Sequence, residues 1–401
     1  MKNGWDKRTI DDICVFRGGG TPSKSNDSYW KGDIPWVSPK DMKSDVITDS
    51  IDHISAEAIE QSTTNLIAAG SVLVVVRSGI LARTIPVAIT GRDVTINQDI
   101  KALCPDKSVD GWFLFYFLKS RLEEMLSLAS RGATVHRIMA DQIRTMEILV
   151  PPLAEQRRIV GILDEAFEGI ATAKANAEKN LQNARAMFDT FLNAVYLGRG
   201  ADAWPKRRLG DVFEIGSSKR IHERDWSPVG VPFYGGKEIV KLAKFGHAVS
   251  NSYISEQKYH EYASKYDMPK PGDILITARG TIGVGYVVQK SDKFYYKDGN
   301  IISMRAKEAA DPHYLLYAFR SNSLADQLGD LSGATVTHLP LEKAKELLLR
   351  MPDVDMQNAM VKRIMEFEGE TQRLESIYQR KLAALDDLKK SLLHQAFSGE
   401  L

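Results

Sequence analysis

The sequence lacks the features by which several classes of protein are recognised. Its 401 residues include two cysteines, Cys14 and Cys104, which are too few for a disulfide framework or a cysteine-based zinc site. The longest apolar run, residues 66–76, is too short to cross a membrane and predicts one buried strand. We therefore expect a cytoplasmic protein with no membrane partner.

Residue patterns that support catalysis are also missing. The chain contains no GxxxxGK[ST] phosphate loop, no GxGxxG, no HExxH, no paired CxxC and no (N/D)PP(Y/F) tetrapeptide of the adenine methyltransferases. Fragments such as CPDK at 104–107 do not make a PD…(D/E)xK nuclease motif. We predict that the chain has no catalytic residues, holds no metal or cofactor and is not an enzyme by itself.

An excess of positive charge is absent as well. The 53 Lys and Arg residues are balanced by 52 Asp and Glu residues, which leaves a net charge of +1. Freestanding DNA-binding proteins are commonly basic, because phosphate neutralisation supplies much of their affinity. If this chain binds DNA, its positive charge must gather on one face or partner proteins must supply the remainder.

What the sequence does contain is an internal repeat. The word GATV occurs at 132–135 and at 333–336, 201 residues apart. Six further pairs of words match in the same order at offsets between 197 and 202, among them WFLFYFLKS from residue 112 and HYLLYAFRS from residue 313. The chain is therefore a tandem duplication.

Each repeat combines strand and helix signals. β-rich runs such as SVLVVV and DILITA precede segments of helical length at 112–130 and 312–331. A long stretch without proline then follows Pro151-Pro152 and Pro352. We predict an α+β fold with globular domains at 1–150 and 201–351, separated by long helices at 151–200 and 352–401.

Heptad spacing in the two long stretches predicts a coiled coil. Small residues such as Ala177 occupy the middle of the first seam, and bulky residues such as Tyr378 occupy the middle of the second. Such seams fit an antiparallel intramolecular pair and a pseudo-twofold molecule, although each seam could instead pair with another chain. The predicted packing residues are Ile159, Leu163, Ile170, Ala177, Phe191, Ile364, Phe367, Leu374, Tyr378, Leu385 and Leu392.

Polar and basic residues recur at loop-like positions of both repeats. Arg77 and Arg279 each end a β-rich run and precede a turn of small residues, a pattern suited to contacts with base edges and phosphates. Any one of these residues could equally be a solvated surface charge. The candidates for DNA binding are Lys24, Lys40, Arg77, Ser78, Arg83, Arg131, Thr134 and Arg137 in the first repeat, and Lys219, Arg220, Lys237, Arg279, Thr281, Lys297 and Thr335 in the second.

Three segments resemble the specificity subunits of type I restriction–modification systems. They are GGGTPSKSNDSYWKGDIPWVSPKDM at 18–42, PPLAEQRRIV at 151–160 and LLHQAFSGEL at 392–401. The resemblance covers essentially the whole chain and implies two target recognition domains, each followed by a long helix. The second repeat departs from the pattern, because MPDVDMQ replaces PPLAEQ and EIGSSKR replaces FRGGGTPSK. Contacts implied for residues 18–23 therefore have no clear counterpart there.

The resemblance also implies partners and a target. It implies a double-stranded DNA target made of two different short sequences separated by a spacer, with an adenine methylated at N6 in each. It implies two modification (methyltransferase) subunits and restriction (endonuclease/translocase) subunits, with S-adenosylmethionine, ATP and Mg on those partners. The alternatives are a coiled-coil assembly protein whose globular domains bind only proteins, and a restriction endonuclease with a cryptic active site.

Overall fold

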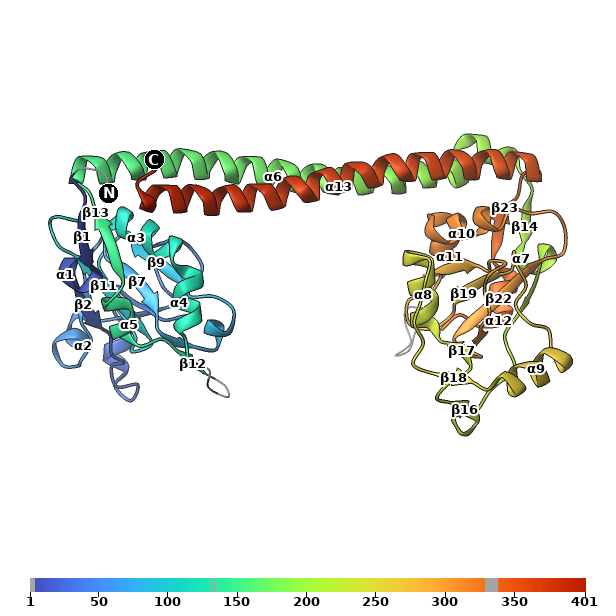
Figure 1. Cartoon of the computed structure of the whole chain (residues 1–401), viewed down its shortest axis with the longest axis horizontal. Helices are drawn as coiled ribbons and strands as arrows, with labels where there is room; N and C mark the ends of the chain where they lie inside the picture. Colours follow the sequence, from blue (N-terminus) through green and yellow to red (C-terminus); the bar gives the residue numbers. More distant parts are fainter. Residues whose placement is uncertain (1–3, 131, 133–134, 329–337) are drawn as a thin grey trace. The chain divides into compact units, whose positions relative to one another are not determined.

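The computed structural model describes residues 4–130, 132, 135–328 and 338–401. Contacts divide it into two compact units: unit 1 is Met1–Glu178 with Arg380–Leu401, and unit 2 is Lys179–Gln379. Each unit therefore contains one globular domain and one part of each long helix, α6 (Leu153–Leu197) and α13 (Val354–Ser398) (Figure 1).

Unit 1 holds the elements of the first globular domain. In chain order they are β1 (Asp6–Thr9), α1 (Ile10–Ile13), β2 (Cys14–Gly18), the 3-10 helix η1 (Asp27–Trp30), β3 (Ile34–Val37), β4 (Val46–Ile47), β5 (Asp52–Ile54), α2 (Ala56–Glu60), β6 (Leu66–Ile67), β7 (Val72–Val75), β8 (Arg77–Ser78), η2 (Gly79–Ala82), β9 (Val87–Thr90), β10 (Val94–Ile96), β11 (Ile100–Pro105), α3 (Gly111–Ser120), α4 (Leu122–Leu128), β12 (His136–Arg137), α5 (Ala140–Arg144) and β13 (Glu147–Val150).

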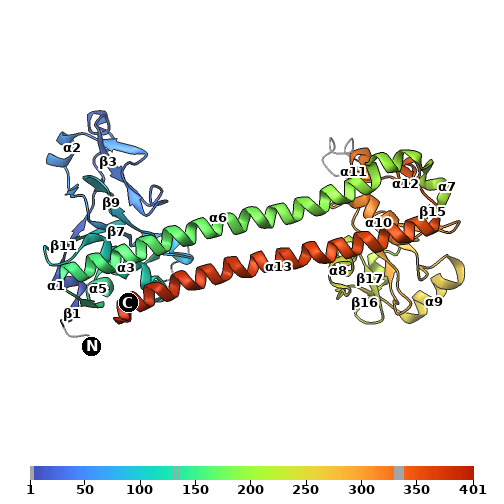
Figure 2. The same ribbon diagram turned by 90° about the horizontal axis from the view of Figure 1, so that it is seen from above.

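Two sheets organise this domain. The larger has the strand order β2-β11-β7-β9-β4, and all four residues of its central strand β7 are buried. The smaller has the order β5-β3-β10-β6, and Figure 2 shows β3 and α2 on the side of unit 1 remote from α6 and α13. A separate antiparallel pair, β1 with β13, joins the start of the domain to its end.

The apolar run at 66–76 differs from its prediction as one buried strand. It contains two strands, β6 and β7, which belong to different sheets. Gly70 lies between them with a φ of +82°, a left-handed conformation that favours glycine and turns the chain. Leu66 at the start of the run is 45% exposed.

The predicted helix at 112–130 is likewise two helices. Asp110 caps α3 by accepting hydrogen bonds from the N–H groups of Trp112 and Phe113, and α3 ends at Ser120, before α4. The inner face of α3 packs against α13, with ring centroids of Phe113 and Phe397 5.1 Å apart. This contact belongs to the main core of unit 1.

Unit 2 repeats this plan. Its elements are η3 (Arg199–Ala203), β14 (Lys206–Arg208), α7 (Leu209–Val212), β15 (Phe213–Gly216), η4 (Glu223–Asp225), β16 (Trp226–Ser227), β17 (Val231–Tyr234), α8 (Gly236–Phe245), β18 (Tyr253–Ile254), α9 (Glu256–Lys265), β19 (Ile274–Thr277), β20 (Gly285–Val287), β21 (Tyr295–Tyr296), β22 (Ile301–Ala306), α10 (Pro312–Arg320), α11 (Asn322–Leu328), α12 (Leu341–Glu346) and β23 (Leu348–Arg350).

The strand orders of unit 2 correspond in their central parts to those of unit 1, while the edge strands β4 and β6 of unit 1 and β16 of unit 2 are not matched among the described strands. One sheet has the order β15-β22-β19-β20 and the other β16-β18-β17-β21, while β14 pairs with β23 as β1 pairs with β13. Equivalent strands form a parallel pair in both units, β3 with β10 in unit 1 and β17 with β21 in unit 2. The α+β fold and the tandem repeat predicted from the sequence are confirmed.

The two long helices run antiparallel within each unit. In unit 1, Arg158 of α6 donates to the Leu401 carbonyl, and Lys174 of α6 pairs with Asp386 of α13 at 2.7 Å. Residues later in α6 therefore contact residues earlier in the C-terminal segment, which is the antiparallel order. In unit 2, Arg185 of α6 pairs with Glu375 of α13. The seams therefore pair within one chain, as predicted.

The buried seam agrees only partly with the heptad prediction. Ile159, Leu163, Ile170, Ala177 and Ile364 are buried, whereas Phe191, Phe367, Tyr378, Leu385 and Leu392 are half-buried. Leu374 is 37% exposed, and the buried position near it is Thr371. A strict 3.5-residue repeat drifts by about 20° per heptad on a straight helix, which moves the contact line off the counted positions.

Candidate nucleic-acid interface

Two predicted arginines lie opposite one another in unit 1. The short strands β8 and β12 pair antiparallel, with Arg77 opposite Arg137 and Ser78 opposite His136. Arg77 is half exposed and lies 3.6 Å from the Asp99 carboxylate through its Nε, while Arg137 is exposed. Figure 1 shows β12 at the end of unit 1 remote from α6 and α13. Two arginines against one carboxylate leave an excess of positive charge suited to an anionic ligand.

The equivalent ladder in unit 2 pairs different residues. Arg279 forms an antiparallel bridge with His338, whose Nδ1 lies 3.1 Å from the Ala278 carbonyl. His338 lies 201 residues after Arg137 and Arg279 lies 202 after Arg77, so the backbone frame is the same. The two units thus place an arginine at one position and a different side chain at the position opposite it.

The glycine-rich segment of unit 1 is held close to the smaller sheet. A Cβ at Gly19 would lie 1.9 Å from the Ile96 carbonyl oxygen, so only glycine fits there. Thr21 donates to Gln98 Oε1 at 2.6 Å, and Trp36 Nε1 donates to the Gly20 carbonyl at 2.9 Å. The backbone carbonyl of Ser23, at the end of this segment, also accepts a hydrogen bond from Trp30 Nε1. These contacts hold the segment as an ordered loop.

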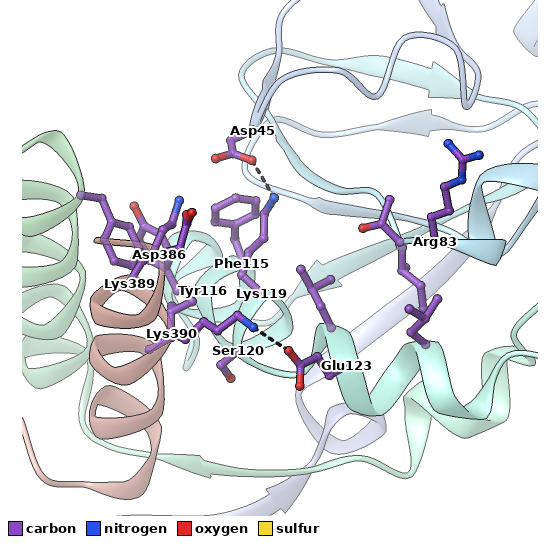
Figure 3. A pocket seen from close by; sticks show the side chains of 16 residues that line it. Asp45, Arg83, Phe115, Tyr116, Lys119, Ser120, Glu123, Asp386, Lys389 and Lys390 are labelled. Atoms are coloured by element: carbon purple, nitrogen blue, oxygen red, sulfur yellow. Dashed lines mark hydrogen bonds and ion pairs between the residues drawn. The ribbon is translucent and has the colours of Figure 1, made fainter. Parts of the chain in front are cut away.

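The remaining predicted residues of unit 1 are more dispersed. Lys24 and Lys40 are exposed in turns, and Ser78 caps η2 by accepting from the Ile80 N–H. Arg83 lines a separate cavity of about 710 Å³ whose wall includes α3, α4 and both long helices. Figure 3 shows Arg83 on the opposite side of this cavity from Lys390 of α13. Arg131 and Thr134 lie outside the described residues.

Unit 2 brings four of its predicted residues together. Two neighbouring cavities of about 280 and 250 Å³ share the side chains of Trp226, Lys297 and Asn300. Lys237 lines the first cavity, and Arg220 and Arg279 line the second. Figure 1 shows β16, which carries Trp226, at the end of unit 2 remote from α13.

The charges around these cavities are only partly balanced. Arg220 Nε pairs with Asp298 at 2.8 Å, and the Glu238 carboxylate accepts from the Gly235 N–H. Lys297 Nζ lies 5.9 Å from the centre of the Trp226 ring, within the range of a cation–π contact. The surface therefore joins positive charge with an aromatic side chain, a combination that suits nucleic acid.

The other predicted residues of unit 2 do not join this cluster. Lys219 lies over the Tyr266 ring, and its backbone is bonded in both directions to the Tyr295 hydroxyl. Burial raises the pKa of Tyr295, so the phenol stays neutral and keeps its proton for the Lys219 carbonyl. Thr281 is exposed, and its carbonyl accepts from Thr277. Thr335 lies outside the described residues.

Sequence reasoning missed two residues at the centre of the unit 2 cluster. Trp226 ends the segment EIGSSKRIHERDW at 214–226, and Trp30 ends the matching segment FRGGGTPSKSNDSYW at 16–30, so the matched tryptophans were an available signal. Asn300 gave no such signal, because its place depends on the turn that precedes β22. In the described part of the chain, no group of three His, Cys, Asp or Glu side chains could hold a metal ion. No helix among the same residues is long and apolar enough to cross a membrane.

Comparison with known proteins finds matches along the whole chain. The family model described as type I restriction modification DNA specificity domain matches residues 2–182 and again residues 201–381. The specificity subunit of the Escherichia coli type I restriction enzyme EcoR124I/EcoR124II is 39% identical over 160 residues, or 39% of this chain and 40% of that relative. That match spans less than two thirds of the relative. The MjaIX specificity subunit of Methanocaldococcus jannaschii is 24% identical over 99% of this chain and 93% of its own length.

Two solved structures share the fold. One, described as the structural basis of complex assembly and conformational transition of the type I R-M system, has a TM-score of 0.79 at 18% identity and covers 100% of this chain and 99% of its own. The HsdS subunit from Thermoanaerobacter tengcongensis has a TM-score of 0.65 at 18% identity and covers 100% and 98%. At such identities the likeness concerns the fold alone.

Proposed function

The chain belongs to the type I restriction modification DNA specificity domain family, as its sequence predicted, and we propose that each of its two units reads one half of an asymmetric bipartite DNA target. The relatives are named as specificity subunits, and the duplicated specificity domain supports DNA recognition by both halves of this chain. The finer assignment, one different half-target for each unit, is our own.

A single observation carries this assignment. The two units share one backbone frame, yet Arg77 lies opposite Arg137 where Arg279 lies opposite His338. Base edges in the major groove present distinct patterns of donors and acceptors, so different side chains on the same frame select different bases. Identical readers would favour a symmetric target, and diverged readers favour an asymmetric one.

The subunit would act without catalysis of its own, in the cytoplasm, as part of a larger complex. We assign the methyl transfer to N6 of adenine to two modification subunits that hold S-adenosylmethionine, and DNA cleavage to restriction subunits that hold ATP and Mg. The paired helices α6 and α13 offer a surface on which such partners could assemble. The net charge of +1 supports this division, since the partners would supply much of the phosphate contact.

The experiment that tests the proposal is a map of methylated adenines across the genome of cells that express this chain with its modification subunit. We expect an asymmetric bipartite motif that disappears when the chain is deleted. A folded complex that gives no chain-dependent motif would refute DNA recognition and favour a protein-binding assembly role. Metal-dependent nicking by the isolated chain would contradict its assignment as non-catalytic.

A further inference from the structure

A short turn in each unit connects one sheet to the other, from β10 to β11 in unit 1 and from β21 to β22 in unit 2, through the same backbone bonds. In unit 1 the Asn97 N–H donates to the Val37 carbonyl, and the Asp99 carbonyl accepts from the Val76 N–H. In unit 2 the Lys297 N–H donates to Tyr234, and the Asn300 carbonyl accepts from Ala278. Lys297 thus occupies the place of Asn97, and Asn300 the place of Asp99.

The side chains of unit 1 are engaged with one another at these two places. Asn97 is only 6% exposed, and its Oδ1 accepts from the Asp99 N–H at 3.0 Å while its Nδ2 donates to the Asp99 carboxylate. The other oxygen of that carboxylate lies 3.6 Å from Arg77. The pair therefore closes its own turn, and Asp99 Oδ1 remains buried without a hydrogen-bond partner among the described residues.

In unit 2 the corresponding turn is held by different hydrogen bonds. The unit 2 turn is one residue longer than the unit 1 turn. Its Gly299 has a φ of +67° and donates its N–H to Ser217 Oγ. The turn is thereby fixed through the backbone groups of Lys297, Gly299 and Asn300, and the side chains of Lys297 and Asn300 take no part in these bonds. Among the described residues, neither the Lys297 ammonium nor the Asn300 amide has a hydrogen-bond partner.

Both of these side chains line the two cavities beside Trp226, and both are half-buried. The indole Nε1 of Trp226 is buried and also lacks a partner within the described part of the chain. Partly buried polar groups without partners are costly unless a ligand or water satisfies them. The geometry therefore presents the Lys297 ammonium, the Trp226 indole N–H and the Asn300 amide in a recess. Its lining holds four basic side chains and the carboxylates of Glu223, Glu238 and Asp298.

We propose that Lys297 and Asn300 form the base-reading pair of unit 2, an inference that rests on the proposed function. A side-chain amide matches the N6 donor and N7 acceptor of adenine, and a lysine ammonium matches the O6 and N7 acceptors of guanine. Asn300 reads an adenine and Lys297 reads a guanine in the half-target of unit 2. Trp226 forms the apolar wall beside them, Arg279 contacts a neighbouring base of the same half-target, and Arg220 faces the phosphates.

The test uses the complex of this chain with its modification subunit. The wild-type motif is mapped first, and methyl transfer is then measured on duplexes in which each base pair of each half is replaced in turn. The variants are Asn300→Ala, Lys297→Ala and, as the control, Lys293→Ala. Lys293 lies 5.7 Å over the Tyr259 ring of the same unit, as Lys297 lies over Trp226, but it pairs with Glu256 and lines neither cavity.

We expect Asn300→Ala to lose roughly 5- to 150-fold of the discrimination at one adenine, and Lys297→Ala a similar factor at one guanine, both in the same half. Discrimination in the other half and in Lys293→Ala stays at the wild-type level, which also shows that the variants are folded. Unchanged discrimination, or equal weakening on all duplexes, would overturn the assignment. Absence of any wild-type motif would instead refute the proposed function, and this inference with it.

Discussion

Two hydrogen bonds of Gln156 in unit 1 recur at Gln357 in unit 2, 201 residues later in the chain. Gln156 Oε1 accepts from the Asp110 N–H at 2.8 Å, and its Nε2 donates to the Pro151 carbonyl at 2.8 Å. Gln357 makes the corresponding bonds to Asp311 and Pro352 at 3.0 and 2.8 Å. Both side chains are buried, so each glutamine fastens the first turn of a long helix to the domain before it.

Replacement of Gln156 by alanine should therefore lower the stability of unit 1. The change leaves buried backbone groups without partners, at a cost of about 1–3 kcal/mol for each. Urea unfolding of the full chain measures the effect, with Gln182→Ala, an exposed glutamine of α6, as the control. Equal unfolding midpoints for the two variants would show that the buried bonds do not hold the helix.

The contact between α10 and α13 gives a second prediction. Glu368 accepts from Arg320 Nη1 at 2.7 Å and from the Tyr317 hydroxyl at 2.6 Å, and the Arg320 guanidinium lies 4.8 Å over the Phe188 ring. We expect Glu368→Ala to destabilise unit 2 by about 1–3 kcal/mol, because it removes the common acceptor. Thermal unfolding compares it with Glu366→Ala, an exposed position of the same helix, which should stay near wild type.

The stability of the helix pair should depend more on the apolar residues buried between the helices than on the ion pairs at their surface. Leu163 is fully buried in the core that also contains Leu393 of α13. Leu163→Ala should cost about 2–5 kcal/mol through lost burial and a cavity. Lys174→Ala breaks only a surface pair with Asp386 and should cost less than about 1 kcal/mol. The reverse ranking in urea unfolding would contradict the packing described for unit 1.

Cysteine labelling checks the core of unit 1 independently. Burial raises the pKa of the Cys14 thiol to about 12, and Cys14 lies on β2. The reactive thiolate is therefore scarce at pH 8, and the side chain is also shielded from reagent. Mass spectrometry after brief alkylation should find Cys14 unmodified in the folded protein and modified in denaturant. Rapid labelling of the folded chain at Cys14 would show that this core is open.

Much of the domain and helix organisation could be predicted, because the duplication repeats the same residues about 200 positions apart in the sequence. The pairs Asp110 with Asp311 and Gln156 with Gln357 recur 201 residues apart, and each pair performs the same structural task. The contact residues of the helix pair were less predictable. Leu374 occupies a predicted heptad position but is exposed, because an α-helix has about 3.6 residues per turn and not the 3.5 of a strict heptad repeat.

The candidate site was predictable only in part. Arg77 and Arg279 stood out because each ends a β-rich run before a turn of small residues, and the structure places them in equivalent ladders opposite Arg137 and His338. Asn300 could not be found in this way, because its exposure to the cavities depends on the left-handed turn at Gly299 and on a bond to Ser217. Such long-range backbone contacts leave no local pattern in the sequence.

The central claim is that the two units read separate halves of one target, and the most direct test compares Arg77→Ala with Arg279→Ala in the assembled complex. The account predicts that methylated-adenine maps of Arg77→Ala show relaxed or lost bases in one half of the motif, and that maps of Arg279→Ala show the same in the other half. Equal loss across both halves from either variant would contradict it.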